Sequence, residues 1–321
     1  MNFEKVCVIL PCFNESLTLP SMVQQIQNIS SEIEILIVDN LSTDDSFKIA
    51  SNLKVKVVRE IKKGKGFAVK RGFLSLSDNC QIVVIVDGDD TYSLSNLIEA
   101  LNLVEDYNYD MVVGNRINKA DSNDNRIKVF RRGHRTGNFM FSKLSQLLHP
   151  SGVRDSLSGF RVMSRNFVES FAGGASEFEI EAELNAHAAF IKAAVGNIDV
   201  DYKGRPIGSK SKLRTFRDGY KILLINFKIF RTYRPKIAYS LIALFWLILS
   251  VVLGYKPITE YFETGLVPRI PSLISAVGAL VVSVQLWNTG MILERVNVAH
   301  LSQIRHNYKM GNKKTLNFFG F

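Results

Sequence analysis

Polar and acidic side chains follow three short apolar segments in the N-terminal half of the chain. Asn14-Glu15 comes after Val6–Leu10, Asp39 after Ile33–Val38, and Asp87-Gly88-Asp89 after Ile82–Val86. Short apolar segments that alternate with helical patterns predict parallel strands, and open α/β sheets bind ligands beyond the carboxyl ends of their strands. One aspartate at a strand end is usually a turn or a helix cap, but three such positions in register indicate a binding site.

Asp87 and Asp89 have the spacing of a divalent-metal site. Both side chains can turn toward one ligand where the alternation of a strand ends. Carboxylate pairs are hard oxygen donors suited to Mg²⁺ or Mn²⁺, with diphosphate and water filling the remaining positions. The sequence therefore predicts a site for Mg²⁺ or Mn²⁺ at Asp87 and Asp89.

A basic segment with two glycines, Lys63–Ala68, has the composition of a phosphate-binding loop. Gly64 and Gly66 permit close approach of the backbone, and Lys65 supplies a positive charge near a base and its phosphates. Asp39 can accept an N–H group of uracil or guanine. Taken alone, the segment is more typical of a basic surface turn.

The pattern around these residues predicts an α/β domain with crossover helices. The strands are expected at Val6–Leu10, Ile33–Val38, Val55–Val58, Ile82–Val86 and Met111–Val113. Helices are expected around Leu17–Ile29 and at Thr43–Ser51, Phe67–Leu76, Leu94–Val104, Thr136–Leu148 and Phe178–Ala194. Cys7, Cys12 and Cys80 have no metal-ligand spacing and are expected to be reduced, buried thiols, as in a cytoplasmic domain.

The C-terminal third has the composition of a membrane anchor. Ile237–Gly254 and Ile270–Leu293 contain no charged residue, and the mean hydropathy of the whole chain is +0.07. Two such segments joined by Tyr255–Arg269 predict a transmembrane hairpin. Lysines and arginines flank its outer ends, so the positive-inside rule places the catalytic domain and both termini in the cytoplasm. The chain is predicted to be an integral membrane protein.

Four segments follow from these patterns. They are a catalytic domain at 1–214, an amphipathic interfacial helix at 215–236, a transmembrane hairpin at 237–293 and a basic tail at 294–321. The net charge is +10, and residues 203–236 hold 11 Lys/Arg against one acid, Asp218. Because this basic segment precedes a membrane span, anionic lipid head groups are favoured as its partner over nucleic acid. No nucleic-acid partner is predicted.

Six motifs together resemble the family 2 glycosyltransferases, and especially their dolichyl-phosphate mannose synthase-like branch, the polyprenyl-phosphate glycosyltransferases. The motifs are Pro11–Glu15, Asp39–Asp44, Lys63–Ala68, Asp87–Asp89, Asp155–Arg161 and Arg205–Leu213. The chain departs from the family pattern at Asn40, where a second Asp is usual, and at Thr91, where a Gln is common.

The resemblance implies a GT-A fold, which is a Rossmann-like mixed sheet with flanking helices. It implies inverting transfer of one hexose or N-acetylhexosamine from a UDP- or GDP-sugar to a polyprenyl (undecaprenyl or dolichyl) phosphate. The implied catalytic residues are Asp87, Asp89, Arg116, Arg135 and Arg205, with the arginines on the acceptor phosphate and Arg132 as a competitor of Arg135. The implied nucleotide-sugar contacts are Pro11, Phe13, Asn14, Glu15, Asp39, Lys65, Gly66, Asp87, Gly88, Asp89, Asp155, Glu181 and Lys212.

Two alternatives stay open at the sequence level. A glycan hydroxyl acceptor would need a carboxylate as general base, for which Asp155 is the only good candidate. A membrane-tethered nucleotide-sugar-binding scaffold without catalysis is the other alternative, although Asp87, Asp89, Arg205 and Lys212 speak against it. The identity of the sugar, the nucleotide and the lipid, and a homo-oligomeric state, are likewise open.

Overall fold

The computed structural model describes residues 2–117, 151–177, 179–202 and 227–318. The chain divides into two compact units, Met1–Asn226 and Phe227–Phe321. The division lies inside the predicted interfacial segment 215–236, and the bounds of the four predicted segments stay predictions. The predicted helix at Thr136–Leu148 and most of the interfacial helix lie outside the described residues.

The first unit is built on a seven-stranded mixed sheet with strand order β3-β2-β1-β4-β6-β5-β7. Its strands are β1 (Val6–Cys12), β2 (Glu34–Asp39), β3 (Lys56–Arg59), β4 (Ile82–Ile85), β5 (Met111–Ile117), β6 (Arg161–Ser164) and β7 (Val195–Asp201). The first four strands are parallel, and β6 lies antiparallel between β4 and β5. The five predicted strands are confirmed, whereas β6 and β7 have no counterpart among them.

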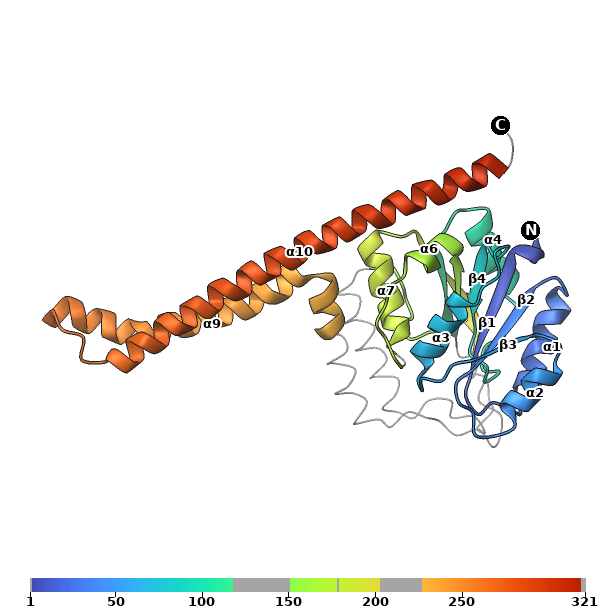
Figure 1. Ribbon diagram of the computed structural model, residues 1–321, viewed down its shortest axis with the longest axis horizontal. Coiled ribbons are helices and arrows are strands. Elements are labelled where there is room, and N and C mark those ends of the chain that lie inside the picture. The colour runs from blue at the N-terminus through green and yellow to red at the C-terminus, as the bar shows by residue number, and fades with distance from the viewer. Residues whose placement is uncertain (1, 118–150, 178, 203–226, 319–321) are drawn as a thin grey trace. The chain divides into compact units, whose positions relative to one another are not determined.

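Helices cover both faces of this sheet, as Figure 1 shows for α1 and α2 on one side and α3 and α7 on the other. A 3₁₀ turn (Phe3–Lys5) precedes β1, and the helices are α1 (Leu19–Ile29), α2 (Ser46–Asn52), α3 (Lys65–Leu74), α4 (Leu97–Glu105), α6 (Arg165–Ser170) and α7 (Ile180–Ile191). Alternate residues of each strand face opposite sides. Val8 of β1 therefore packs in the core under α1 and α4, and Ile9 in the core under α3 and α7. Cys7, Cys12 and Cys80 are buried free thiols, as predicted.

Helix α7 is buried along most of its length, including four polar side chains, Glu181, Glu183, Asn185 and His187. An amphipathic surface helix would expose them. Glu181 therefore does not lie on a solvated helix face, and each of these side chains is held by contacts inside the unit. Asn185 Oδ1 accepts from Arg161 (2.7 Å), and Glu183 Oε2 accepts from the N–H group of Ala175 (2.8 Å).

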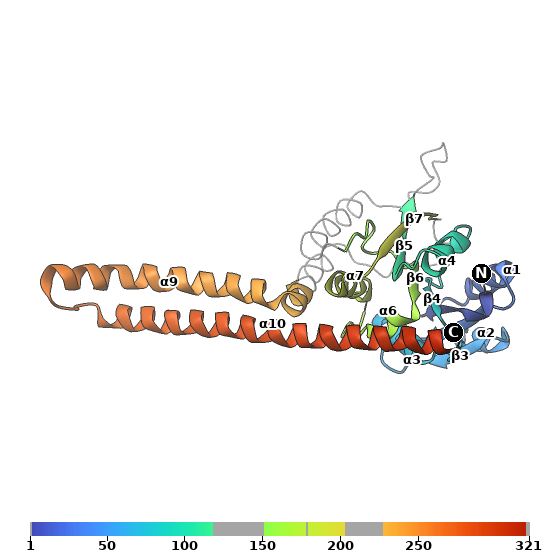
Figure 2. The same cartoon turned by 90° about the horizontal axis from the view of Figure 1, so that it is seen from above.

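The second unit is a helical hairpin of α9 (Pro235–Thr264) and α10 (Ile270–Phe318), whose two helices run side by side in Figures 1 and 2. Both contain a stretch long and apolar enough to cross a membrane. The two helices extend beyond the predicted spans, since α9 continues past Gly254 through Pro257 to Thr264 and α10 continues past Leu293 to Phe318, and the bounds of the spans themselves stay predictions.

Serine hydroxyls join the two helices of the hairpin. Ser250 and Ser283 donate to the carbonyl oxygens of Ala276 and Ala243, both at 2.8 Å, and Ser272 donates to that of Leu253. In an apolar environment these hydroxyls need protein partners. The hairpin satisfies them internally and leaves large apolar side chains such as Phe245 exposed.

Candidate active site

The loops that follow β1, β2 and β4 meet at the carboxyl edge of the sheet. Asn14, with a φ of 55°, accepts from the N–H group of Thr43 (2.7 Å) and donates to its hydroxyl (3.1 Å). Gly88 approaches the β1 end so closely that an added Cβ would lie 3.3 Å from the Pro11 carbonyl oxygen. Its own carbonyl accepts from Thr18 at 2.6 Å. Among the predicted contacts, Pro11 thus lies near the end of β1, and Phe13, Asn14, Glu15 and Gly88 lie in the loops that follow β1 and β4.

Asp39 is completely buried at the end of β2. Its carboxylate accepts from Arg59 Nε (3.1 Å) of β3 and from the N–H group of Ser42 (3.3 Å). Arg59 in turn lies over the Phe47 ring, 4.5 Å from its centroid, with about half of its side chain exposed. The predicted contact of Asp39 with a base is untested, and the structure adds Arg59 as the exposed partner beside it.

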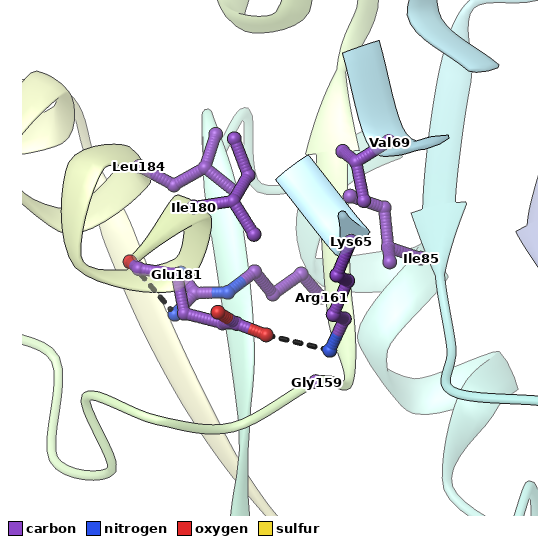
Figure 3. Close-up of a pocket in the computed structure, with 8 residues that line it drawn as sticks. All are labelled: Lys65, Val69, Ile85, Gly159, Arg161, Ile180, Glu181 and Leu184. Carbon is purple, nitrogen blue, oxygen red and sulfur yellow. Dashed lines mark hydrogen bonds and ion pairs between the residues drawn. The ribbon is translucent and has the colours of Figure 1, made fainter. Parts of the chain in front are cut away.

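A lysine bridges two carboxylates at the carboxyl edge of the sheet. Lys65 Nζ lies 2.5 Å from Asp87 Oδ1 and 2.6 Å from Glu181 Oε1. Burial alone would lower the pKa of Lys65, but the two carboxylates outweigh it and raise the pKa above its ordinary value. Lys65 is therefore a permanent cation here. Figure 3 shows it reaching the Glu181 carboxylate while Arg161 reaches the backbone carbonyl of the same residue.

Glycines let other chain segments approach this cluster. An added Cβ at Gly159 would overlap the Asp87 carboxylate, so only glycine fits there. The N–H group of Gly66 donates to the carbonyl of Ser176 (3.1 Å), and a Cβ on Gly66 would lie 2.6 Å from the Ala175 carbonyl oxygen. The close approach predicted for Gly66 is thus made by the protein's own backbone. Its predicted contact with a nucleotide stays a prediction.

Asp89 is buried, and its orientation is set by Thr91. The Thr91 hydroxyl donates to Asp89 Oδ1 at 2.6 Å, and the Thr91 N–H group does so at 3.3 Å. Thr91, which replaces the common Gln, therefore supports Asp89. Next to it, the buried Tyr92 hydroxyl accepts from the N–H group of Gly159 (2.8 Å) and so ties the β4 end to the segment before β6.

Asp87 and Asp89 fit a hard divalent ion, because they place two carboxylates on one turn. The described residues contain no group of three His, Cys, Asp or Glu that could enclose a metal. A donor set of this size leaves positions for diphosphate and water, which is the coordination that Mg²⁺ favours. The second observation is Glu181 Oε2, the one buried side-chain N or O atom in the described part of the chain without a hydrogen-bond partner. This carboxylate oxygen is an acceptor beside the Lys65–Asp87 pair.

Arg116 of β5 and Asp155 form a bidentate ion pair. Arg116 Nε lies 2.6 Å from Asp155 Oδ2, and Nη2 lies 2.8 Å from Oδ1. Asp155 also accepts from the N–H groups of Arg116 and Leu157. Burial alone would lower the pKa of Arg116, but Tyr92 and Asp155 raise it overall. The guanidinium lies 5.6 Å from the centroid of the Tyr202 ring.

Arg161 is a buried cation that the sequence patterns did not single out as a site residue. It donates to Asn185 Oδ1 (2.7 Å) and to the carbonyls of Ser158, Ser156 and Glu181. Burial lowers the pKa of Arg161 to about 10, against the opposing effect of Glu181. Arg161 thus holds α7, and with it Glu181, against the segment before β6.

The structure brings together most, but not all, of the predicted residues. Arg135, Arg205 and Lys212, with the competitor Arg132, lie outside the described residues. Sequence reasoning missed Arg59, Tyr92, Arg161 and Tyr202. Arg161 ends a motif that was recognised, and Arg59 directly follows a predicted strand, so both had a signal. The two tyrosines had none, because their positions depend on the bridge between Tyr92 and Tyr202, which lie far apart in the sequence.

This chain is similar to known proteins in both sequence and fold. Residues 7–171 match the family described as glycosyl transferase family 2. Glycosyltransferase AglJ of Haloferax volcanii is 25% identical over 304 residues, covering 94% of this chain and 97% of its own. The dolichyl-phosphate hexose transferase of the same organism is 28% identical over 222 residues, covering 69% and 92%.

Among solved structures, glucosyl-3-phosphoglycerate synthase of Mycobacterium tuberculosis, in complex with Mn²⁺, UDP-glucose and phosphoglyceric acid, superposes with a TM-score of 0.52. The match covers 70% of this chain and 79% of that one at 18% identity, so it shows a shared GT-A fold. The same synthase was also solved with Mg²⁺ and UDP. The family match spans about half of the chain and includes Asp39, Lys65, Asp87 and Asp89, so this chain belongs to glycosyl transferase family 2.

Proposed function

We propose that this glycosyltransferase moves one hexose or N-acetylhexosamine, with inversion, from a UDP- or GDP-sugar to a polyprenyl phosphate. The dolichyl-phosphate hexose transferase of Haloferax volcanii supports a lipid phosphate acceptor. Two helices apolar enough to cross a membrane support an acceptor in the bilayer. The carboxylate pair Asp87 and Asp89 supports a nucleotide-sugar donor with a divalent ion.

The pairing of Asp155 with Arg116 carries the choice of acceptor. A sugar hydroxyl must lose a proton as it attacks, so it needs a carboxylate that can accept one. Both Asp155 oxygens, at 2.6 and 2.8 Å from the Arg116 guanidinium, are already occupied. A phosphate monoester is an anion at neutral pH and needs charge neutralisation and positioning, which an arginine provides. The site therefore suits a phosphate nucleophile better than a hydroxyl.

The proposed donor site is built on Lys65 and the two carboxylates that it bridges, Asp87 and Glu181. Asp87 and Asp89 would hold Mg²⁺ or Mn²⁺, which supplies charge neutralisation to the leaving nucleotide diphosphate. Lys65 keeps both Asp87 and Glu181 in place. Glu181 Oε2 is buried and has no hydrogen-bond partner among the described residues, so it is suited to accept a hydrogen bond from a hydroxyl of the donor sugar. Asp39 and Lys212 complete the proposed nucleotide-sugar contacts.

The acceptor phosphate is proposed to lie among Arg116, Arg135 and Arg205. Guanidinium groups bind phosphate oxygens in pairs, and several of them hold the nucleophile in line with the anomeric carbon. The basic segment 203–236 is proposed to contact lipid head groups, with the catalytic domain and both termini on the cytoplasmic side.

An acceptor panel tests the proposal. Purified protein in detergent is given UDP- and GDP-sugars with either a polyprenyl phosphate or soluble sugar hydroxyl acceptors, and the product mass is measured with and without EDTA. We expect a sugar-phosphate-lipid product that EDTA abolishes. Transfer to the hydroxyl compounds at a comparable rate would support an envelope-glycan enzyme instead. Donor binding without turnover on any acceptor would support the scaffold alternative.

A further inference from the structure

Asn40 uses both ends of its carboxamide inside the protein. Its Nδ2 donates to the carbonyl oxygens of Lys62 (2.7 Å) and, at a longer distance, Glu60 (3.4 Å), and its Oδ1 accepts from the N–H group of Gly64 (2.6 Å). The side chain is 4% exposed, and its backbone N–H group donates to Cys12 of β1 (2.8 Å). Asn40 therefore joins the β2 end to the loop before α3 through one donor and one acceptor.

The loop held by Asn40 contains two lysines whose side chains reach different parts of the site. The Lys63 ammonium lies over the Phe13 ring (5.1 Å) at the β1 end, and Lys65 bridges Asp87 and Glu181. Gly64, between them, has a φ of 138°, a conformation that only glycine adopts readily. The two shorter bonds from Asn40 lie on either side of Lys63, so they fix the path of the loop between two proposed ligand contacts.

We propose that Asn40 is a positioning residue that sets the Lys62–Lys65 segment for the diphosphate of a nucleotide, without contacting the base itself. The inference rests on the proposed function, since it concerns the same donor site. A carboxylate at this position, which is usual in the family pattern, could accept from Gly64 but could not donate to Lys62. Asn40 thus gives this chain a loop tether that requires a carboxamide.

Two variants separate positioning from charge. Asn40→Ala removes all three side-chain hydrogen bonds without adding charge, and Asn40→Asp keeps the acceptor, loses the donor and adds a negative charge. If Asn40 positions the loop, both variants raise the Kd for UDP or GDP and the KM for the donor by about tenfold, which is the effect of one unmade buried hydrogen bond. The kcat at saturating donor and the KM for lipid phosphate stay near wild type.

Hydrogen exchange of the 61–67 segment gives a readout independent of activity. It should become faster in Asn40→Ala, in which the Gly64 N–H group loses its acceptor. Asn197→Ala is the matched control, because Asn197 also donates to one carbonyl (Gly152, 2.9 Å) and accepts from one N–H group (Arg154, 2.9 Å). We expect Asn197→Ala to leave the nucleotide Kd and the 61–67 exchange unchanged.

Three outcomes overturn the inference. Nucleotide Kd values and donor KM values equal to wild type in both Asn40 variants would remove the positioning role. A raised Kd in Asn40→Asp alone would assign the effect to charge. A wild-type chain that binds neither UDP nor GDP would overturn the proposed function as well, so the two failures can be told apart.

Discussion

Asp87 and Asp89 lie two residues apart yet have different surroundings. Asp87 is paired with Lys65, whereas Asp89 is oriented by the Thr91 hydroxyl and is more deeply buried. Lys65 therefore holds one carboxylate, and Thr91 orients the other. Both would serve as oxygen donors to a divalent ion.

Asp89→Asn is accordingly expected to lower transfer by about a hundredfold or more, since a metal ion contributes several kcal/mol to such a step. Mn²⁺ binding in the presence of UDP, followed by electron paramagnetic resonance, should weaken in parallel. Asp90→Asn is the control. The Asp90 carboxylate accepts from Ser21 and Gln25 on α1, and Asn tolerates its φ of 55°. Equal activity of Asp89→Asn and wild type would remove the metal assignment.

Asp155→Asn tests the role of the Arg116 pair. If Asp155 positions Arg116 for the acceptor, the KM for lipid phosphate rises by about tenfold, because a charge-assisted bond is lost, and the donor KM is unchanged. If Asp155 is a general base, kcat falls steeply while both KM values persist. Glu169→Gln, which breaks the more exposed Arg165–Glu169 pair, controls for the loss of an ion pair.

At the scale of elements, the site depends on how α3 and α7 pack on one face of the sheet. Helix α3 brings Lys65 to its first turn, and α7 brings Glu181 to its own first turn. The backbone of Ala175 and Ser176, just before α7, lies directly against Gly64 and Gly66 at the start of α3. The ion pair between the helices therefore requires glycines in the loop as well as charges on the helices.

Gly66→Ala should destabilise the protein by about 1–3 kcal/mol, because its Cβ would lie 2.6 Å from the Ala175 carbonyl oxygen. Thermal unfolding without nucleotide measures the effect as a lower Tm. Gly174→Ala is the control, since the nearest atom to its added Cβ is 3.9 Å away. An unchanged Tm for Gly66→Ala would contradict the observed packing of the two helices.

The whole molecule combines a GT-A unit with a helical hairpin. In the apolar stretch of each hairpin helix, only 17% of the residues are buried within the protein, so most of that surface needs another apolar environment. The turn between the helices is charged, with Arg269 paired to Glu260 at 2.9 Å. These properties suit a hairpin whose turn lies in water on the far side of a membrane.

Labelling with a membrane-impermeant maleimide tests this topology in intact cells. Glu263→Cys, in the exposed last turn of α9, should be labelled directly, and Glu32→Cys in the first unit only after permeabilisation. The three native cysteines are buried, so wild type should stay unlabelled under folding conditions. Direct labelling at Glu32→Cys would reverse the proposed orientation.

Local patterns in the sequence by themselves determined the first four parallel strands, the residues at their carboxyl ends and the two apolar C-terminal helices. Each depends on a short periodicity or on residues a few positions apart, and those are properties of the chain that packing does not change. The family assignment had the same basis, since its motifs are short and stand in a fixed order.

Only the tertiary structure decided which charges meet. Lys65 pairs with Glu181 and Arg116 with Asp155, across separations of 116 and 39 residues. The first pair depends on the packing of α3 against α7, and the second joins β5 to the segment before its antiparallel neighbour β6, so both depend on contacts that no local pattern encodes. The same holds for Asn40, whose departure from the family motif has a reason only once its carboxamide is seen between Lys62 and Gly64. Hydrogen-bond partners are set by packing in space, and a sequence pattern shows only which groups need one.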